Sequence, residues 1–261
     1  MSVMTAMLKV ISALSDNYIY LLVWGNMAVA VDPGEAAPVL KALNKQNLEL
    51  QAIIVTHHHW DHTAGVEELV DACDCPVIGP QDDRVPRLTQ IAEEGEVVSF
   101  GPLNLRVFSV PGHTSTHVAF YEPDQKWLLC GDALFGAGCG RLFEGTPEEM
   151  HKSLAKLCEL PDDTQILCGH EYTVKNLEFA SSIEPDNQKV RERLGHARSL
   201  RKKSEPTVPS TLAEEKATNP FLRAHDPGLK KALNMSDSSD LEVFTKVRQM
   251  RDRYCFLSAK S

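Results

Sequence analysis

The chain has 261 residues, of which 43% are hydrophobic and 24% charged, and this composition is typical of a folded protein with a substantial buried core. Its formal net charge of -9 disfavours binding to nucleic acid or to an anionic membrane, because both partners need a dense cationic surface. Lys9 and Asp16 interrupt the N-terminal apolar stretch, so we expect no signal peptide, no membrane span and a cytoplasmic location. The seven cysteines have no regular spacing and indicate reduced thiols.

The first part of the chain alternates short β-rich runs with helical patterns. The turn signal Asp32-Pro33-Gly34 follows the third run, and Thr63 is the expected N-cap of the second helix. The pattern predicts strands over 7–13, 18–24, 27–31 and 50–55, and helices over 38–46 and 63–72.

Further strands are expected in the middle of the chain, followed by helices to the end. Many of these runs are continuously apolar, which indicates sheets covered on both faces. Thr146 and Glu149 form a capping box at the start of a helix that runs to about 159. The strands are expected over 76–79, 96–99, 103–110, 117–121, 126–130 and 165–168, and the later helices over 173–182, 186–203, 211–216, 228–234 and 238–257. We therefore predict a strand-rich domain over 1–172 and a second, helical domain over 173–261.

A histidine cluster, THHHWDH, directly follows the expected strand at 50–55. Residues two apart in an extended segment point the same way, so His57 and His59 can bind one ion. His58 then faces away from it.

The turn into the next helix projects the remaining ligands of this cluster, Asp61 and His62, to a different place. Trp60 is expected to pack and fix the loop. Asp32 closes a nearby strand, and two interpretations remain for it: it orients a ligand imidazole, or it only forms the turn.

Three other strands end in the same manner, with a glycine before a candidate ligand. Glycine lets the backbone turn sharply and lets other groups come close, which a crowded metal site requires. One such segment would be weak evidence, but three beside the histidine cluster predict a site. The candidate ligands at these ends are His113, Asp132 and His170.

Five histidines and two aspartates are too many for one tetrahedral ion and suit two. Imidazole-rich ligation favours zinc, with iron or manganese as alternatives, over magnesium or calcium. Two divalent ions, two carboxylates and a bridging hydroxide leave about one positive charge, which suits stabilisation of a single oxyanion during acyl transfer to water.

These residues resemble the hallmark of the metallo-β-lactamase superfamily, and within it the chain is similar to the glyoxalase II family, the hydroxyacylglutathione hydrolases. The segments that carry the second resemblance extend beyond the histidine cluster over nearly the whole chain. They are PGHTSTH at 111–117, GCGRLFEGT at 138–146, GHEYT at 169–173, NPFLR at 219–223 and RQMRDRY at 248–254.

The resemblance implies an α/β fold, a four-layered αβ/βα sandwich over 1–172 that forms the catalytic domain. It also implies a C-terminal α-helical domain over 173–261 that binds the substrate. It implies hydrolysis of S-D-lactoylglutathione by a hydroxide held between two metals, the second step of methylglyoxal detoxification. One metal is expected on His57, His59 and His113, the other on Asp61, His62 and His170, with Asp132 bridging them. Asp61 and Asp132 are the expected catalytic carboxylates, and the expected substrate contacts are Arg141, Phe143, Tyr172, Arg248 and Arg251.

Some of these positions depart from the family pattern. Several relatives have lysine at 141 and 251, so the charge is kept there, and tyrosine at 143, so one hydroxyl is lost. From the residues alone, Arg248, Arg251 and Arg253 could also form a solvated helix face. The resemblance favours the first two as ligand contacts and leaves Arg253 at the surface.

We expect this thioesterase to be a monomer that acts on a small-molecule glutathione thioester. Three other functions are alternatives to it. The first is a glutathione persulfide dioxygenase with a single iron, which the helical tail disfavours. The second is a nuclease, which the acidic balance disfavours. The third is a protein that sequesters metal without catalysis, which the expected arginine cluster disfavours.

Overall fold

The computed structural model describes residues 5–258, and two compact units organise them. The first unit comprises the described residues up to Ser109 together with Thr116–Gly131. The second unit comprises Val110–Ser115 and the chain from Asp132 onward. The chain therefore enters the second unit twice.

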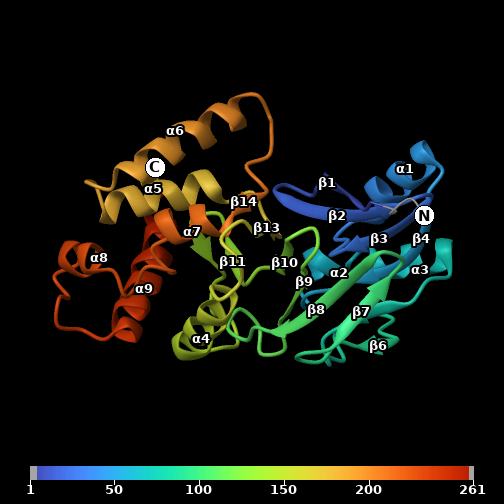
Figure 1. Cartoon of the computed structure of the whole chain (residues 1–261), viewed down its shortest axis with the longest axis horizontal. Coiled ribbons are helices and arrows are strands. Elements are labelled where there is room, and N and C mark those ends of the chain that lie inside the picture. Colours follow the sequence, from blue (N-terminus) through green and yellow to red (C-terminus); the bar gives the residue numbers. More distant parts are fainter. Residues whose placement is uncertain (1–4, 259–261) are drawn as a thin grey trace. The chain divides into compact units, whose positions relative to one another are not determined.

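A six-stranded mixed sheet and a four-stranded antiparallel meander form the first unit, which is coloured blue to green in Figure 1. The mixed sheet runs in chain order through β1 (Met7–Ala13), β2 (Asn17–Trp24), β3 (Met27–Val31), β4 (Glu49–Ile54), β5 (Val77–Gly79) and β6 (Gln90–Ile91). The meander consists of β7 (Val97–Phe100), β8 (Leu103–Ser109), β9 (Val118–Glu122) and β10 (Trp127–Gly131). The helices are α1 (Ala36–Gln46), α2 (Trp60–Thr63) and α3 (Val66–Cys73).

A nearly continuous apolar run explains the burial of β2, which lies between β1 and β3 in the mixed sheet. All eight of its residues are buried, so it is covered on both faces. On one face Ile19 and Leu21 join a core with Val39 of α1 and Leu69 of α3. β3, β4 and β5 are parallel neighbours, so their carboxyl ends lie along one edge of the sheet.

The second unit is mainly helical, and its last helices are coloured orange to red in Figure 1. Its short strands are β11 (Leu134–Phe135), β12 (Gly138–Cys139), β13 (Gln165–Cys168) and β14 (Ser210–Thr211). Its helices are α4 (Pro147–Leu157), α5 (Thr173–Ile183), α6 (Gln188–Lys202), α7 (Leu212–Thr218), α8 (Pro227–Ala232) and α9 (Asp240–Ser258). The small core between α5 and α6 contains Leu177 and Val190.

Most sequence-based elements agree closely with the structure, and the exceptions are the start of the helix expected at 63–72 and four unpredicted strands of two residues each. The capping box of α4 is present, because Thr146 accepts a hydrogen bond from the Glu149 amide. The expected N-cap at Thr63 is wrong: Thr63 is the last residue of α2, and Gly65 precedes α3. No helix among residues 5–258 is long and apolar enough to cross a membrane.

Candidate metal and substrate site

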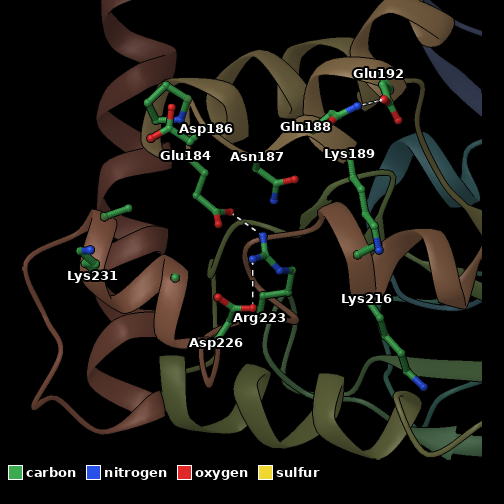
Figure 2. A pocket seen from close by; sticks show the side chains of 14 residues that line it. Glu184, Asp186, Asn187, Gln188, Lys189, Glu192, Lys216, Arg223, Asp226 and Lys231 are labelled. Carbon is green, nitrogen blue, oxygen red and sulfur yellow. Dashed lines mark hydrogen bonds and ion pairs between the residues drawn. The ribbon is translucent and has the colours of Figure 1, made fainter.

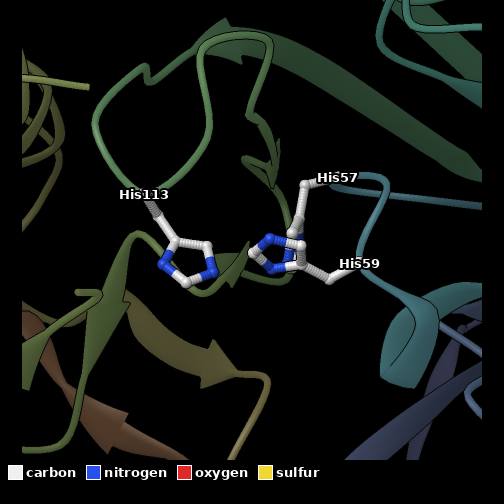
Figure 3. Close-up of side chains that lie close together, drawn as sticks. All are labelled: His57, His59 and His113. Atoms are coloured by element: carbon white, nitrogen blue, oxygen red, sulfur yellow. The ribbon is translucent and has the colours of Figure 1, made fainter. Parts of the chain in front are cut away.

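The first-unit ligand candidates lie in the loop of residues 56–63 that follows β4, called the ligand loop below. His57 and His62 are fully buried, and Nε2 of His57 lies 3.1 Å from Nδ1 of His59. Two imidazole nitrogens on one tetrahedral zinc ion, each about 2.0–2.1 Å from it, lie roughly 3.3 Å apart. The pair therefore has the separation that ligation of one ion requires. Figure 3 draws both rings, together with His113 of the second unit.

Thr56 fixes which nitrogen of His57 is available to a metal. The Thr56 hydroxyl donates a hydrogen bond of 2.7 Å to Oδ2 of Asp32. Because its proton is used in this way, the same oxygen accepts from Nδ1 of His57 at 3.0 Å. His57 is then protonated on Nδ1 and presents the lone pair of Nε2, as a metal ligand must.

Asp32 orients a second ligand in the same way. Its Oδ1 accepts the Thr56 amide at 2.7 Å, and its Oδ2 lies 3.1 Å from Nδ1 of His62, which leaves Nε2 of that ring for a metal. Asp32 is buried and has a left-handed backbone with φ of 52°, so it also forms the turn after β3. Both interpretations of Asp32 given above thus agree with the structure.

Asp61 and the remaining side chains of the ligand loop have distinct surroundings. Asn17 donates hydrogen bonds to the Asp61 carboxylate at 3.0 Å and to its carbonyl at 3.1 Å, which fixes the direction of this side chain. His58 turns to another carboxylate, 3.4 Å away on Asp82, as expected for a side chain that is not a ligand. Trp60, by contrast, is 68% exposed, so the prediction that it packs against the loop is wrong.

Asp132 is the centre of the second-unit ligand set. Its Oδ2 lies 3.4 Å from Nε2 of His113 and 3.4 Å from Nε2 of His170, and all three residues are buried. Nδ1 of His113 donates to the Arg141 carbonyl at 2.7 Å, so its Nε2 carries the lone pair. A single carboxylate oxygen between two ligand-type nitrogens is the arrangement that a bridging ligand requires.

Glycine is required where these two ligands approach each other. Gly112 and Gly131, which precede His113 and Asp132, have φ of 148° and 47°, where side chains are rarely accommodated. A Cβ atom on Gly140 would lie 2.9 Å from Nδ1 of His113. The sequence-based argument from these strand-end glycines is therefore supported for His113 and Asp132.

Two of the expected substrate residues are aromatic and flank the second-unit histidines. The Tyr172 ring stacks on His170 with the centroids 4.7 Å apart. Phe143 meets His113 edge-on at 5.4 Å and is 61% exposed. Phe143 therefore presents an apolar ring to solvent beside a candidate ligand.

The three expected arginine contacts do not form one group. Nη2 of Arg248 is 2.8 Å from Oδ1 of Asp252, and Nε of Arg141 is 3.6 Å from the same atom, so these two meet at one carboxylate. Arg251 instead donates to Oδ1 of Asn176 at 3.0 Å and 3.2 Å. Arg248 and Arg251 are buried, whereas Arg253 is exposed, as the sequence predicted.

A cavity of about 970 Å³ lies in the helical part of the second unit (Figure 2). Arg223 lies in its wall, paired with Glu184 at 2.6 Å and Asp226 at 3.2 Å. None of the seven predicted metal ligands and none of the five predicted substrate contacts lines it. We therefore assign the chemistry to the ligand residues and not to this cavity.

Several residues that organise the ligands were missed by the sequence reasoning. Thr56 could have been found, because it directly precedes His57 and has a hydroxyl that can pair with a ligand ring. Asn17 and Asp82 could not, since they are 44 and 24 residues away from their partners Asp61 and His58. His117 is not among the predicted ligands, and its ring stacks on His57 with a centroid distance of 4.6 Å.

Two family models match the chain and together span most of it. Residues 15–170 match the metallo-β-lactamase superfamily, and residues 171–254 match the hydroxyacylglutathione hydrolase C-terminus. A hydroxyacylglutathione hydrolase of Alkalilimnicola ehrlichii is 50% identical over 93% of this chain and 97% of its own length. The chain belongs to the hydroxyacylglutathione hydrolase family. Another hydroxyacylglutathione hydrolase, from Chromohalobacter salexigens, is 46% identical over 94% of this chain and 98% of its own.

Solved structures confirm the metallo-β-lactamase fold of this family member. ETHE1 from Myxococcus xanthus has a TM-score of 0.67 at 22% identity and covers 94% of this chain and 90% of its own. The BLEG-1 B3 metallo-β-lactamase has a TM-score of 0.62 at 23% identity and covers 83% of this chain and 99% of its own. At these identities the likeness shows the fold alone. The fold and the histidine and aspartate clusters together indicate a protein that binds divalent metal.

Proposed function

We propose that this chain hydrolyses the thioester of S-D-lactoylglutathione, and of related S-2-hydroxyacylglutathiones, to glutathione and the free 2-hydroxy acid. The reaction is the second step of methylglyoxal detoxification. The observation that carries the proposal is the orientation of the histidines. His57, His62 and His113 each direct Nδ1 to an oxygen acceptor and so present Nε2 for metal binding.

The proposal assigns the ligands of both units to two divalent ions. His57, His59 and His113 would hold one ion, Asp61, His62 and His170 would hold the other, and Asp132 would serve as a ligand to both. The 3.1 Å pair of His57 and His59 supports the first group, and the two 3.4 Å distances of Asp132 support its bridging role. Zinc is the favoured metal for this donor set, with iron and manganese as alternatives. A di-iron-bound protein, TTHA1623, is 27% identical to this chain over 81% of it, with a TM-score of 0.59, and supports the count of two.

Two bound ions would supply a hydroxide nucleophile near neutral pH and polarise the thioester carbonyl. Asp61 and Asp132 are the catalytic carboxylates of the proposal, because their two negative charges reduce the charge of the centre to the level that stabilises one oxyanion. Asn17 keeps the Asp61 carboxylate in place for this task. The leaving thiolate has a parent pKa of about 8.5, so no side chain has to protonate it first.

The substrate arm of the proposal consists of Arg141, Phe143, Tyr172, Arg248 and Arg251. Guanidinium groups pair with carboxylates in a bidentate manner, and glutathione carries two carboxylates. Arg141 and Arg248 already share the Asp252 carboxylate, which supports their ability to bind a carboxylate of the substrate. Phe143 and Tyr172 lie against His113 and His170 and offer apolar surface next to the ligands.

The setting of the enzyme is part of the proposal. We infer a cytoplasmic monomer that acts on a small-molecule thioester and binds neither nucleic acid nor membrane. The net charge of -9 supports the last two inferences.

The decisive experiment combines hydrolysis of S-D-lactoylglutathione with metal counting on the same preparation. We expect two metal ions per chain and rapid thioester cleavage. Asp132→Ala should lose at least about 100-fold in kcat/KM, because it removes the carboxylate between the two histidines. Asp124→Asn, which replaces an exposed aspartate of the first unit, is the control and should behave as the wild type. An Asp132→Ala protein with two ions and near-normal turnover would contradict the assignment.

The same preparation separates this proposal from its main rival. A glutathione persulfide dioxygenase would contain one iron per chain and consume oxygen with glutathione persulfide. Hydroxyacylglutathione hydrolase is the name carried by both relatives described above, at 46% and 50% identity. Oxygen uptake with a single iron would nevertheless replace the hydrolase proposal.

A further inference from the structure

A carboxylate outside the proposed ligand set, Asp82, joins the ligand loop to two other segments of the first unit. Asp82 follows β5, the parallel neighbour of β4, and the ligand loop follows β4 itself. Because the carboxyl ends of parallel neighbours lie at the same edge of a sheet, the two loops are adjacent. Nδ1 of His58 lies 3.4 Å from Oδ2 of Asp82, and both side chains are largely buried.

Arg84 and Thr116 hold this carboxylate in one orientation. The Arg84 amide and Nε donate to Oδ1 of Asp82 at 3.0 and 2.8 Å, and its Nη2 donates to Oδ2 at 2.8 Å. The Thr116 hydroxyl donates to Oδ2 at 2.7 Å. These hydrogen bonds, above all those from Arg84, lower the pKa of Asp82, so the group remains a carboxylate. Below, the Asp82 cluster means His58, Asp82, Arg84 and Thr116.

The Asp82 cluster reaches a proposed ligand through a ring contact. The His58 ring packs edge-on against the His59 ring with the centroids 4.8 Å apart. On its other side, the loop is closed by Thr63, whose hydroxyl donates to the carbonyl of His59 at 3.0 Å. His59 is thus held at its ring by His58 and at its backbone by Thr63. A shift of Asp82 would release the first of these contacts.

The Asp82 cluster also contains a residue that lies close in sequence to another proposed ligand, His113. Thr116 is three residues after His113 in the sequence, so fixing its side chain shortens the free length of the segment that carries His113. His58 and Thr116 therefore each lie close in the sequence to a ligand of the same ion, the one assigned to His57, His59 and His113. Asp61 and His62 are oriented by Asn17 and Asp32 instead, which are not members of the cluster.

We propose that Asp82 is a positioning residue that, through His58 and Thr116, aligns the three-histidine metal site and leaves the other site unaffected. The inference rests on the proposed function, since it takes the two ligand groups from there. The simpler alternative is that Asp82 only closes its own turn with Arg84. The alternative predicts no effect of Thr116 and no difference between the two metal sites.

The test measures metal binding by the full-length protein, with Co²⁺ and Zn²⁺ as probes and a chromophoric chelator as competitor. In Asp82→Ala we expect one ion to bind about 10–100-fold more weakly and the other to bind as in the wild type. The Co²⁺ absorption spectrum should lose the contribution of one site at limiting metal. Asp71→Asn is a matched control, because Asp71 is also paired with an arginine, Arg87 at 2.9 Å, but is exposed and outside the cluster.

Thr116 supplies a second pair of variants that keeps the test decisive if Asp82→Ala folds poorly. Thr116→Val has the same shape but no hydroxyl, and should weaken the same single ion by a smaller factor than Asp82→Ala. Thr116→Ser keeps the hydroxyl and should restore the wild-type affinity. If Thr116→Val binds both ions as the wild type does, the inference is overturned.

The remaining outcomes also decide the matter. Equal weakening of both ions in Asp82→Ala, in parallel with a lower urea midpoint, would show a general loss of structure and overturn the inference. Wild-type affinities for both ions in Asp82→Ala would overturn it too, while leaving the proposed function intact. A wild-type protein that binds fewer than two ions would contradict the proposed function itself, and this inference with it.

Discussion

Buried polar groups are organised differently around the ligand loop and in the helical part of the second unit. Around the ligand loop, Asp32 and Thr56 each direct one nitrogen of a histidine and so prepare the other nitrogen for a ligand. In the helical part, Glu215 is fully buried and accepts from the Ala137 amide at 2.7 Å, Ser210 at 2.6 Å and Arg193 at 2.5 Å. The first arrangement is completed by a cation, whereas the second is complete within the protein.

Burial of charge therefore serves two purposes in one chain. The Glu215 network connects α6 and α7 to the turn between β11 and β12, so its loss should reduce stability. The network at Asp32 connects histidines that must remain close together, so its loss should reduce metal affinity.

Glu215→Ala should lower the free energy of unfolding by about 3–5 kcal/mol, because Arg193 is left as a buried charge without its main partner. Urea denaturation measures this effect, and metal counting on the folded protein should be unchanged. Glu214→Ala is the neighbouring control: Glu214 lies 3.3 Å from Arg193, but its side chain is 42% exposed, so its loss should cost at most about 1 kcal/mol. Equal losses in the two variants would refute the special role of the buried carboxylate.

Asp32→Asn should weaken Zn²⁺ binding about 10–100-fold with little change in unfolding by urea. Asparagine tolerates the left-handed backbone at this position but has only one acceptor oxygen. Its NH2 group would therefore face either the Thr56 amide or the Thr56 hydroxyl and Nδ1 of His62, all of which need an acceptor. Chelator competition measures the affinity. Asp74→Asn is the control, because Asp74 has nearly the same φ of 51° and is exposed at the end of α3. A loss of stability without a loss of metal affinity would show that Asp32, like Glu215, stabilises the fold and does not prepare a metal site.

Phe143→Tyr should lower the KM for S-D-lactoylglutathione, because it adds, to an exposed ring of the substrate arm, a hydroxyl that can form a hydrogen bond. One hydrogen bond contributes about 0.5–1.5 kcal/mol, or roughly 2- to 13-fold in affinity. Steady-state kinetics measures the change, and kcat should stay constant. The ring is exposed, so the urea midpoint should not move. An unchanged KM would remove Phe143 from the substrate arm.

Cys139 should give the smallest effect, which is the absence of a reaction. Burial raises the pKa of its thiol to about 11, although Arg248 nearby acts in the opposite direction. Below that pH the thiol stays protonated, so iodoacetamide at pH 8 should leave Cys139 unmodified in the folded protein and label it in urea. Mass spectrometry of the peptides measures the labelling. Rapid labelling without urea would show that the part of the second unit around Cys139 opens in the folded protein.

The sequence predicted most of the fold, because strong local patterns set the bounds of the elements. β1, β3 and β13 have the predicted bounds, since each is an apolar run ended by a turn or a glycine. The break between α2 and α3 was missed because its cause is not local. The Gly65 amide donates to the carbonyl of Pro33, and a Cβ atom on Gly65 would lie only 2.7 Å from that oxygen. The strands β6, β11, β12 and β14, of two residues each, are too short to show a periodicity.

The candidate ligands were readable for the same reason, since each one follows a strand end or lies in the histidine cluster. The groups that orient the ligands could not be predicted, because no sequence pattern connects an Asn or Asp with a partner that lies far away in the sequence. Asn17 and Asp82 are of this kind. Trp60 was misjudged because a large apolar residue between two ligands suggests packing, and only the structure shows that it is exposed.

The path of the chain between the two units limits how the protein can be rearranged by recombination. Val110–Ser115 belongs to the second unit, although the strands on either side of it, β8 and β9, belong to the first. An exchange of everything after Gly131 for the corresponding part of a relative would therefore leave His113 behind with the old gene. Working chimaeras of this family should need two further crossovers, one on each side of His113, in addition to the one after Gly131, or partners that already agree in that short segment.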